Sequence, residues 1–192
     1  MTQEEVLNIF QEAGAILQGH FILTSGRRSA IYLHKAKVFM YPQLVERLCH
    51  ALAEKIKKEV SFPVDYLVGP AIGGLIPCYE TARHLNVPAI WVEREDRDFV
   101  LKRFEIPQRA KIIIIEDILT TGLSIKETIA AMEKEGAEIV AAACLIDRSG
   151  GKVDVGVPLI SLCKYEVPSY DVENLPAALA ALPPVKLGSR KQ

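Results

Sequence analysis

The sequence lacks the segments that would place it in a membrane, in a zinc-binding class or in an oxidising compartment. No apolar run approaches the roughly 20 residues that a membrane-spanning helix needs, and the acidic, amphipathic N-terminus is not typical of a signal peptide. The four cysteines among 192 residues are scattered, without the C-x-x-C or Cys/His spacing that indicates zinc. We therefore expect a cytoplasmic protein, not bound to membranes, whose thiols are reduced and buried.

A strong charge of one sign is also missing. The chain has 23 Lys and Arg against 24 Asp and Glu, a formal net charge of −1. This balance gives no overall basic field, so we expect no nucleic-acid partner. Neither a P-loop nor a dinucleotide-binding fingerprint is present. A hydrophobic content of 49% and a length of 192 residues favour one globular domain with a fully formed core.

The order of the expected elements favours an α/β fold with a mainly parallel sheet. Strands that alternate with helices imply right-handed crossovers, and ligands in such folds bind at the carboxyl ends of the strands. Residues 15–34 read as short extended pieces, and residues 93–104 as charged and irregular. Periodicity and capping signals predict helices at residues 2–13, 43–59, 75–85 and 125–135, and strands at 64–68, 88–92, 111–115, 139–146 and 159–163.

Residues 111–124 carry most of the functional signal. Four consecutive isoleucines predict a short strand that is buried on both faces of a parallel sheet. Two acids, Glu116 and Asp117, follow the isoleucines directly. Carboxylates in this position can accept hydrogen bonds from sugar hydroxyls or hold water on a Mg²⁺ ion.

The hydroxyl–glycine loop, residues 120–124, comes next. A helix is expected to begin there, because Ser124 and Glu127 have the spacing of a capping box. The unpaired amides and positive dipole end of a helix N-terminus suit a phosphate. Gly122 allows a positive φ and a close approach to an anion, and the hydroxyls add donors. The pattern predicts a ribose-phosphate site, with an ordinary strand-to-helix turn as the alternative.

The same stretch closely resembles the signature with which type I phosphoribosyltransferases bind phosphoribosyl pyrophosphate (PRPP). In that signature an apolar strand, two acids and two variable residues precede Thr-Thr/Ala-Gly and a small or hydroxyl residue. Many members have a second glycine where this chain has Leu123, which would be strained if a positive φ were required there. The PRPP-binding residues that the resemblance implies here are Glu116, Asp117, Ile118, Leu119, Thr120, Thr121, Gly122, Leu123 and Ser124.

The resemblance also implies the fold and its division. A type I phosphoribosyltransferase has a central, mainly parallel sheet flanked by helices, with a small N-terminal hood. We expect a phosphoribosyltransferase domain at residues 1–172, with the hood at 1–40 and the core at 41–172. Residues 173–192, with Pro183 and Pro184 and a polar end, are expected to form a mobile C-terminal tail.

The glycine-rich segment at residues 69–74 matches the family's pyrophosphate loop in order and spacing. Three glycines beside a helix start suggest a backbone cradle for an anion, although a tight turn is the alternative. The resemblance implies that Ala71, Ile72 and Gly73 bind PRPP.

Residues 93–103 fall where the orotate branch of the family has a mobile loop of cations. An enzyme that expels pyrophosphate needs such cations to neutralise the leaving group. Here Glu93 stands at the place of the family's arginine and Phe99 near that of its histidine. A solvated surface loop is the alternative. The resemblance implies catalytic roles for Arg94 and Lys102 beside Glu116 and Asp117, and PRPP contacts for Arg94, Arg97 and Arg103.

Two segments resemble the orotate branch in the acceptor site. Residues 21–29, followed by Tyr32, are similar to its Phe-x-Leu-x-Ser-Gly-x-x-Ser element, with Thr24 where a lysine is usual. Residues 147–151 are similar to the Asp-Arg turn that grips orotate. An arginine pairs bidentately with a planar carboxylate, which orotate carries. The implied orotate-binding residues are Phe21, Ser25, Thr120 and Arg148.

The activity implied is that of a pentosyltransferase in pyrimidine biosynthesis. It would transfer ribose 5-phosphate from PRPP to orotate, giving orotidine 5′-monophosphate and pyrophosphate. Mg²⁺ is the implied cofactor, held by PRPP and water with Asp117 as a candidate contact, and a homodimer is the implied assembly. Two alternatives stay open: transfer to another base such as adenine, and a PRPP-sensing regulator of nucleic acid.

Overall fold

The computed structural model describes residues 1–23, 25–61 and 63–187. Its main sheet has six strands in the order β5-β4-β3-β6-β7-β8. The antiparallel pair is β4 with β5, and the other neighbours in the sheet are parallel. The prediction of an α/β fold with a mainly parallel sheet is therefore confirmed. The strands are β3 (Tyr66–Pro70), β4 (Ala89–Glu95), β5 (Asp98–Val100), β6 (Lys111–Leu119), β7 (Glu138–Asp147) and β8 (Leu159–Lys164).

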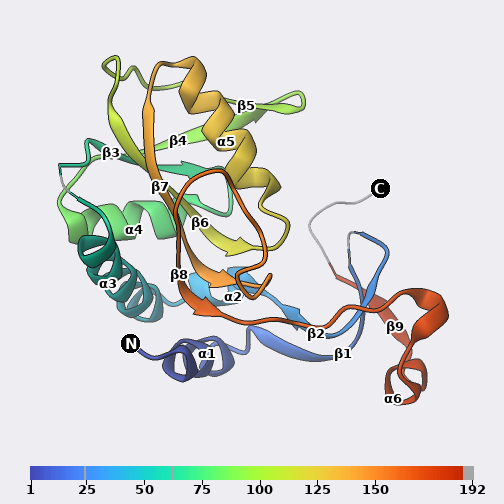
Figure 1. The fold of residues 1–192 in the computed structure, drawn as a ribbon. Helices are drawn as coiled ribbons and strands as arrows, with labels where there is room; N and C mark the ends of the chain where they lie inside the picture. Colours follow the sequence, from blue (N-terminus) through green and yellow to red (C-terminus); the bar gives the residue numbers. More distant parts are fainter. Residues whose placement is uncertain (24, 62, 188–192) are drawn as a thin grey trace.

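Helices cover both faces of this sheet (Figure 1). The helices α1 (Gln3–Glu12), α3 (Pro42–Glu59) and α4 (Leu75–Leu85) share one buried apolar cluster with Ile113 and Ile115 of β6. The helix α5 (Leu123–Lys134) packs on the other face, in a cluster with Ile112 and Ile114. Side chains of a strand alternate between faces, so the isoleucine run supplies both cores and the prediction of a doubly buried strand is confirmed.

The hood is a three-stranded sheet beside the main one, at the lower right of Figure 1. Its strands β1 (Ile16–Ile22) and β2 (Arg28–Leu33) are antiparallel, and α2 (Lys35–Phe39) leads from them towards the core. The C-terminal segment returns to the hood through η1 (Val172–Asn174) and α6 (Ala177–Ala180) and adds β9 (Pro184–Lys186) parallel to β1.

A side-chain contact also joins this returning segment to the hood. The Nδ1 of His20 lies 2.9 Å from the carbonyl oxygen of Leu182. Sequence analysis assigned no structure to the tail, whereas its described part forms the third strand of the hood sheet. Residues 188–192 of the expected tail lie outside the described residues, as does Thr24.

Three local predictions are wrong. Strand β6 runs on to Leu119, because Leu119 is still paired with Asp147 of β7, so the two acids lie inside the strand rather than after it. The expected capping box is not formed: Gly122 is the N-cap of α5 and Ser124 lies within the first turn. The segment expected to be irregular is instead an antiparallel hairpin of β4 and β5, with Glu93 paired to Val100.

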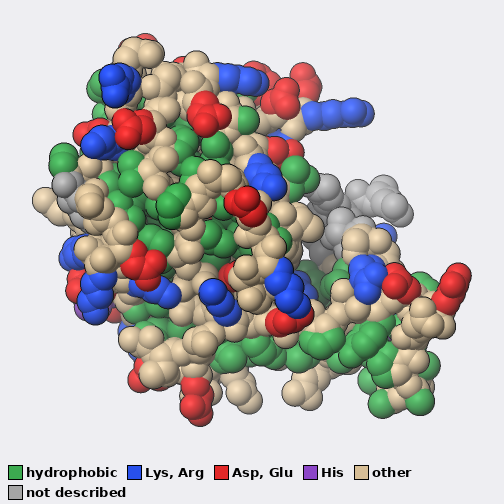
Figure 2. Space-filling view, in the orientation of Figure 1, with side chains coloured by type: hydrophobic (Ala, Val, Ile, Leu, Met, Phe, Trp, Pro, Cys, Tyr) green, Lys and Arg blue, Asp and Glu red, His purple; other side chains and the backbone are tan. Residues whose placement is uncertain are grey.

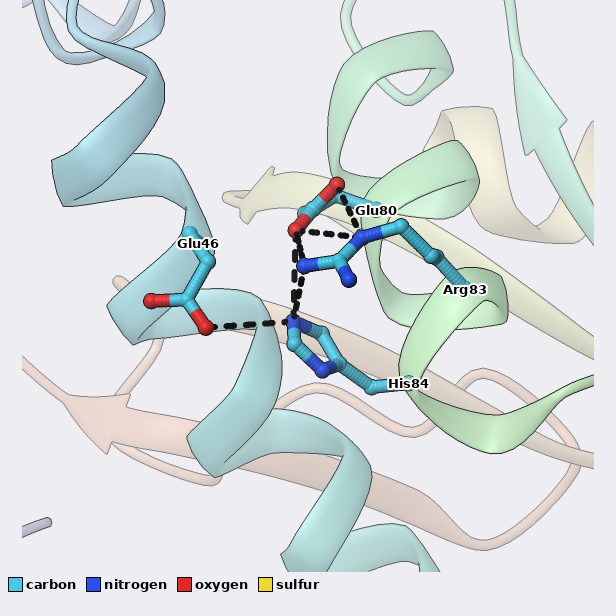
Figure 3. A network of polar contacts seen from close by, with 4 residues as sticks. All are labelled: Glu46, Glu80, Arg83 and His84. Carbon is cyan, nitrogen blue, oxygen red and sulfur yellow. Dashed lines mark hydrogen bonds and ion pairs between the residues drawn. The ribbon is translucent and has the colours of Figure 1, made fainter.

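Helices α3 and α4 are joined at the surface by a network of charged side chains (Figure 3). The Nε2 of His84 on α4 lies 3.2 Å from Glu80 on the same helix and 3.7 Å from Glu46 on α3. Arg83 donates to Glu80 at 2.6 Å. The side chains of His84 and Glu80 are only 11% and 18% exposed, and the contact with Glu46 links two helices that frame an apolar groove.

Basic and acidic side chains are interspersed over the face drawn in Figure 2, in keeping with the balanced composition. Over the part of the chain that the structure describes, no helix is both long enough and apolar enough to cross a bilayer.

Candidate active site

The hydroxyl–glycine loop joins β6 to α5 and forms the first part of the site. Gly122 has φ 75° and ψ 4°, a left-handed conformation that L side chains rarely adopt. A Cβ atom at this position would lie 2.8 Å from Cγ1 of Val153 and 2.9 Å from Cγ1 of Val155, so the loop also needs glycine for space. Leu123 is the first residue of α5 and has no positive φ, so the departure from the family pattern at this position causes no backbone strain.

A small cavity of about 30 Å³ opens inside this loop. It is lined by Glu116 and by residues 118–125, which include both threonines and the backbone at the start of α5. The loop thus surrounds a polar space at a helix N-terminus, where amide N–H groups favour an anion.

The two acids of β6 point to opposite faces of the strand. Glu116 lines the cavity on the α5 side, whereas Asp117 points towards the side of α2 and residues 69–74, where its carboxylate contacts Lys35. The backbone N–H of Asp117 donates to Oε1 of Glu116 at 3.0 Å. Burial, and next the charge of Asp117, raise the pKa of Glu116 to about 8.

Lys35 of α2 is a site residue that sequence analysis missed. Its Nζ lies 2.6 Å from Oδ2 and 2.9 Å from Oδ1 of Asp117, whose side chain is 1% exposed. Burial favours the neutral amine, but the attraction of Asp117 prevails and raises the pKa of Lys35. Nothing in the local sequence separates Lys35 from Lys37 two residues later, so no sequence signal could have found it.

The glycine-rich segment, residues 69–74, packs directly against this pair. A Cβ on Gly73 would lie 2.6 Å from Oδ2 of Asp117 and 2.9 Å from Nζ of Lys35. The N–H of Ala71 donates to the carbonyl of Val92 at 2.8 Å, and Ile72 is 84% exposed. Of the three residues expected here, the structure therefore brings Gly73 to Asp117, while the N–H of Ala71 is hydrogen-bonded to β4 and the Ile72 side chain is exposed.

A turn after β7 places Arg148 beside the hydroxyl–glycine loop. The buried carboxylate of Asp147 accepts bonds from Ser149 N–H (2.8 Å), Ser149 Oγ (2.6 Å) and Gly151 N–H (2.8 Å), which fixes the turn. The N–H of Arg148 donates to the carbonyl of Leu119 at 2.9 Å, next to Thr120.

The Nε of Arg148 is buried and has no hydrogen-bond partner within the described residues. Burial lowers the pKa of this guanidinium. A buried, unpaired donor of this kind calls for an acceptor.

The hood contains the aromatic side chains Phe21 and Tyr32, which the sequence indicated for the acceptor site. Phe21 is buried, and its ring centroid lies 5.6 Å from that of Tyr32. Burial lowers the pKa of Arg148, and an electrostatic contribution from Tyr32 opposes this effect. Ser25, by contrast, lies exposed in the turn between β1 and β2, beside Thr24, which the structure does not describe.

The expected loop cations lie on or near the β4–β5 hairpin, and three of the four pair with acids. The guanidinium of Arg94 lies 4.0 Å from the centroid of the Phe99 ring and pairs with Glu127 of α5. Lys102 pairs with Glu95 at 2.8 Å, Arg103 pairs with Glu93, and Arg97 is exposed at the turn. Phe99, at the place of the family's histidine, is buried in the core cluster of α5. In this conformation Arg94, Lys102 and Arg103 therefore pair with acids other than Glu116 and Asp117.

Comparisons with known proteins agree with this geometry. The family model described as the phosphoribosyl transferase domain matches residues 40–162. The chain is 64% identical to orotate phosphoribosyltransferase 2 of Mesorhizobium japonicum and 61% identical to orotate phosphoribosyltransferase of Bartonella tribocorum, in both cases over 99% of each chain. This protein therefore belongs to the phosphoribosyltransferase family.

Solved structures place the fold within that family. Orotate phosphoribosyltransferase of Aeropyrum pernix superposes with a TM-score of 0.70 at 24% identity, over 83% of this chain and 93% of that one. A solved adenine phosphoribosyltransferase superposes with a TM-score of 0.65 at 20% identity, over 80% and 99% of the two chains. The expected type I fold is thus confirmed. The full-length relatives at 61–64% identity confirm the resemblance to the orotate branch.

Proposed function

We propose that this enzyme transfers ribose 5-phosphate from PRPP to orotate, giving orotidine 5′-monophosphate and pyrophosphate, a step of pyrimidine biosynthesis. The observation that carries the proposal is the buried Nε of Arg148, which has no hydrogen-bond partner within the described residues, on a residue whose backbone N–H donates to Leu119 beside the hydroxyl–glycine loop. An arginine so placed suits the carboxylate of orotate, beside a loop that suits a 5′-phosphate.

In the reaction a ring nitrogen of orotate forms a bond to the anomeric carbon while the bond to the pyrophosphate oxygen breaks. Positive charge develops on the ribose, and negative charge on the leaving group. The buried carboxylate of Asp117 stabilises the ribose charge and accepts bonds from the ribose hydroxyls, with Glu116 on the other side of β6. Since no covalent intermediate is needed, positioning and electrostatics supply the rate.

The remaining residues divide between the ends of the two substrates. Amides and hydroxyls of residues 120–124, with Ile118 and Leu119 shaping the end of β6, bind the 5′-phosphate, and Gly73 with the neighbouring Ala71 and Ile72 binds pyrophosphate. Arg148, Thr120 and Phe21 contact orotate, and Ser25 approaches it from the hood. Arg94, Arg97, Lys102 and Arg103 neutralise the leaving group once the hairpin has moved.

Mg²⁺ fits this site as a companion of the substrate. No group of three or more metal-binding side chains is found among residues 1–23, 25–61 and 63–187, so the protein's own donor set is smaller than a metal cage needs. Asp117 would hold the ion through water, next to Gly73 and the pyrophosphate that it accompanies. When bound, Mg²⁺ neutralises pyrophosphate charge and so improves the leaving group.

A homodimer is part of the proposal. Helices α3 and α4 and strand β4 frame a groove of about 750 Å³, lined by apolar side chains that include Ile76, Tyr79 and Trp91. Its lining also includes Glu46, Glu80 and Arg83, three of the residues drawn in Figure 3. Met40 and Tyr41, next to residues of its lining, are also exposed. An apolar area of this kind indicates a protein interface. We assign it to a second copy of this chain.

The two other candidate functions have weaker support. The adenine enzymes share the fold, but a purine has no carboxylate for Arg148. A nucleic-acid regulator would need a basic face, and the charges in Figure 2 are mixed. A cytoplasmic location is also proposed, since all four cysteines are buried free thiols.

The test is release of pyrophosphate by the purified protein with PRPP, Mg²⁺ and a panel of bases. We expect release with orotate and none with adenine, hypoxanthine or uracil, and loss of turnover in Asp117→Asn. Release with a purine instead of orotate would overturn the proposal, and salt-dependent binding of RNA or DNA without turnover would favour the regulator.

A further inference from the structure

Lys35 brings a cation to the point where three segments of the site meet. Its Nζ contacts both carboxylate oxygens of Asp117 on β6, at 2.6 Å and 2.9 Å. The same Nζ lies 2.9 Å from the position of a Cβ on Gly73, so it also borders the glycine-rich segment. Lys35 belongs to α2 of the hood, 82 residues away from Asp117 in the chain. The amine therefore stands between the proposed ribose site and the proposed pyrophosphate site.

The side chains of Lys35 and Asp117 differ in exposure, and the more exposed one, Lys35, is the one that can move. The side chain of Asp117 is 1% exposed, whereas that of Lys35 is 45% exposed. A lysine has four flexible methylenes and an ammonium that is well solvated. Asp117 is fixed within β6, where Ile118 N–H also donates to its carboxylate. Lys35 can leave the pair by rotation of its own side chain, without a change in the backbone.

The proposed reaction requires that the pair open. Lys35 donates a hydrogen bond to Oδ1 of Asp117 and forms an ion pair with Oδ2, and the same oxygens must accept bonds from the ribose hydroxyls. A cation released at that place would lie beside pyrophosphate on residues 69–74, which carries several negative charges. We propose that Lys35 is a PRPP-binding cation that neutralises Asp117 in the free enzyme and transfers to the pyrophosphate group when the ribose hydroxyls take its place.

This role is needed because three of the four cations predicted to contact pyrophosphate are paired with acids, and the fourth, Arg97, is exposed at the turn of the β4–β5 hairpin. Arg94, Lys102 and Arg103 pair with Glu127, Glu95 and Glu93 on or beside the β4–β5 hairpin. Within the described residues, Asp117 forms its ion pair with Lys35. Lys35 thus supplies positive charge at the junction of ribose and pyrophosphate before the hairpin moves.

The experiment compares ligands that do and do not carry pyrophosphate. Dissociation constants of pyrophosphate, PRPP and orotidine 5′-monophosphate are measured by calorimetry at saturating Mg²⁺ for the wild type, Lys35→Met and Lys35→Arg. We expect Lys35→Met to weaken pyrophosphate and PRPP roughly ten- to hundred-fold, the worth of a charge-assisted hydrogen bond. Its affinity for the monophosphate should change by less than about three-fold, and Lys35→Arg should restore most of the loss.

Lys37→Met is the matched control. Lys37 lies on the same helix and carries the same charge, but its Nζ points to Gly14, 3.8 Å from the position of a Cβ there. This variant should bind all three ligands as the wild type does. Thermal unfolding of each variant shows that the chain is folded, and Lys35→Gln takes the place of Lys35→Met if the latter does not fold.

The inference rests on the proposed function, and the two fail in different ways. If the wild type binds neither PRPP nor pyrophosphate, the proposed function is wrong. If the wild type binds both and the Lys35 variants equal it, with only a lower melting temperature, Lys35 is a structural counter-charge and this inference is wrong. An equal loss for all three ligands would also contradict it, since the effect would then not be directed at pyrophosphate.

Discussion

The backbone N–H of Arg148 donates to the carbonyl of Leu119, and this bond of 2.9 Å joins the turn after β7 to the loop after β6. One side of the junction presents a guanidinium and the other presents the hydroxyls and amides of residues 120–124. The distance between the proposed carboxylate site and the proposed phosphate site is therefore set by the pairing of two core strands. A ligand with a base at one end and a phosphate at the other fits such a junction.

Replacing Arg148 with alanine should weaken the acceptor and spare PRPP. Loss of a charge-assisted pair costs about 1.5–3 kcal/mol, so kcat/KM for orotate should fall roughly ten- to 150-fold. The KM for PRPP should change little. Lys152→Ala, in the same turn but paired with exposed Glu166, is the control and should retain both constants. An unchanged kcat/KM for orotate in Arg148→Ala would contradict the assignment of this guanidinium.

Gly122→Ala should damage both the fold and PRPP binding. The substitution combines a left-handed φ with contacts of 2.8–2.9 Å to Val153 and Val155, and we expect a loss of about 2–4 kcal/mol in the free energy of unfolding. Gly156→Ala has a similar φ of 89° but nothing within 4 Å, and should cost only about 1–2 kcal/mol. Urea titration gives the stabilities. Equal losses in the two variants would show that space around Gly122 is unimportant.

The raised pKa of Glu116 should make the protein less stable as the pH rises. The folded state keeps the proton up to a pKa of about 8, whereas the unfolded chain loses it near 4.5. Between these values the folded state binds more protons, so the free energy of unfolding falls with increasing pH. Glu116→Gln should flatten this fall, by on the order of a few kcal/mol at most. Melting temperatures from pH 5 to 9 test this, and parallel curves for the two proteins would refute it.

Tyr79→Asp should separate the proposed dimer. Tyr79 is 69% exposed and lines the apolar groove between α3, α4 and β4, so a charge there would be desolvated in an interface. Sedimentation velocity should show a dimer for the wild type and a monomer for this variant. Val172→Asp, at an exposed apolar position on the C-terminal segment, should remain dimeric. A wild-type monomer at micromolar concentration would contradict the proposed assembly.

The sequence predicted those parts of the molecule whose signals are local. The isoleucine run of β6 is doubly buried because its neighbours are helices on both faces, and Gly122 takes the positive φ that its place in the loop suggested. The Asp-Arg pattern singled out the turn at Arg148, whose N–H donates to the carbonyl of Leu119, next to Thr120.

The parts that sequence reasoning missed depend on contacts between distant segments. The pair of Lys35 with Asp117 forms only because the hood folds over β6. Glu116 and Asp117 lie inside the strand because β7 extends the pairing to Leu119. The capping box at Ser124 is absent because Gly122 already serves as the N-cap of α5. None of these features has a periodicity or a motif of its own.

The most direct test of the account is a crystal structure of the protein with orotidine 5′-monophosphate. We expect the 5′-phosphate on the amides of residues 121–124, the ribose hydroxyls at Asp117 and the base carboxylate on Arg148. A nucleotide bound elsewhere, with residues 120–124 and Arg148 making no contact to it, would contradict the account.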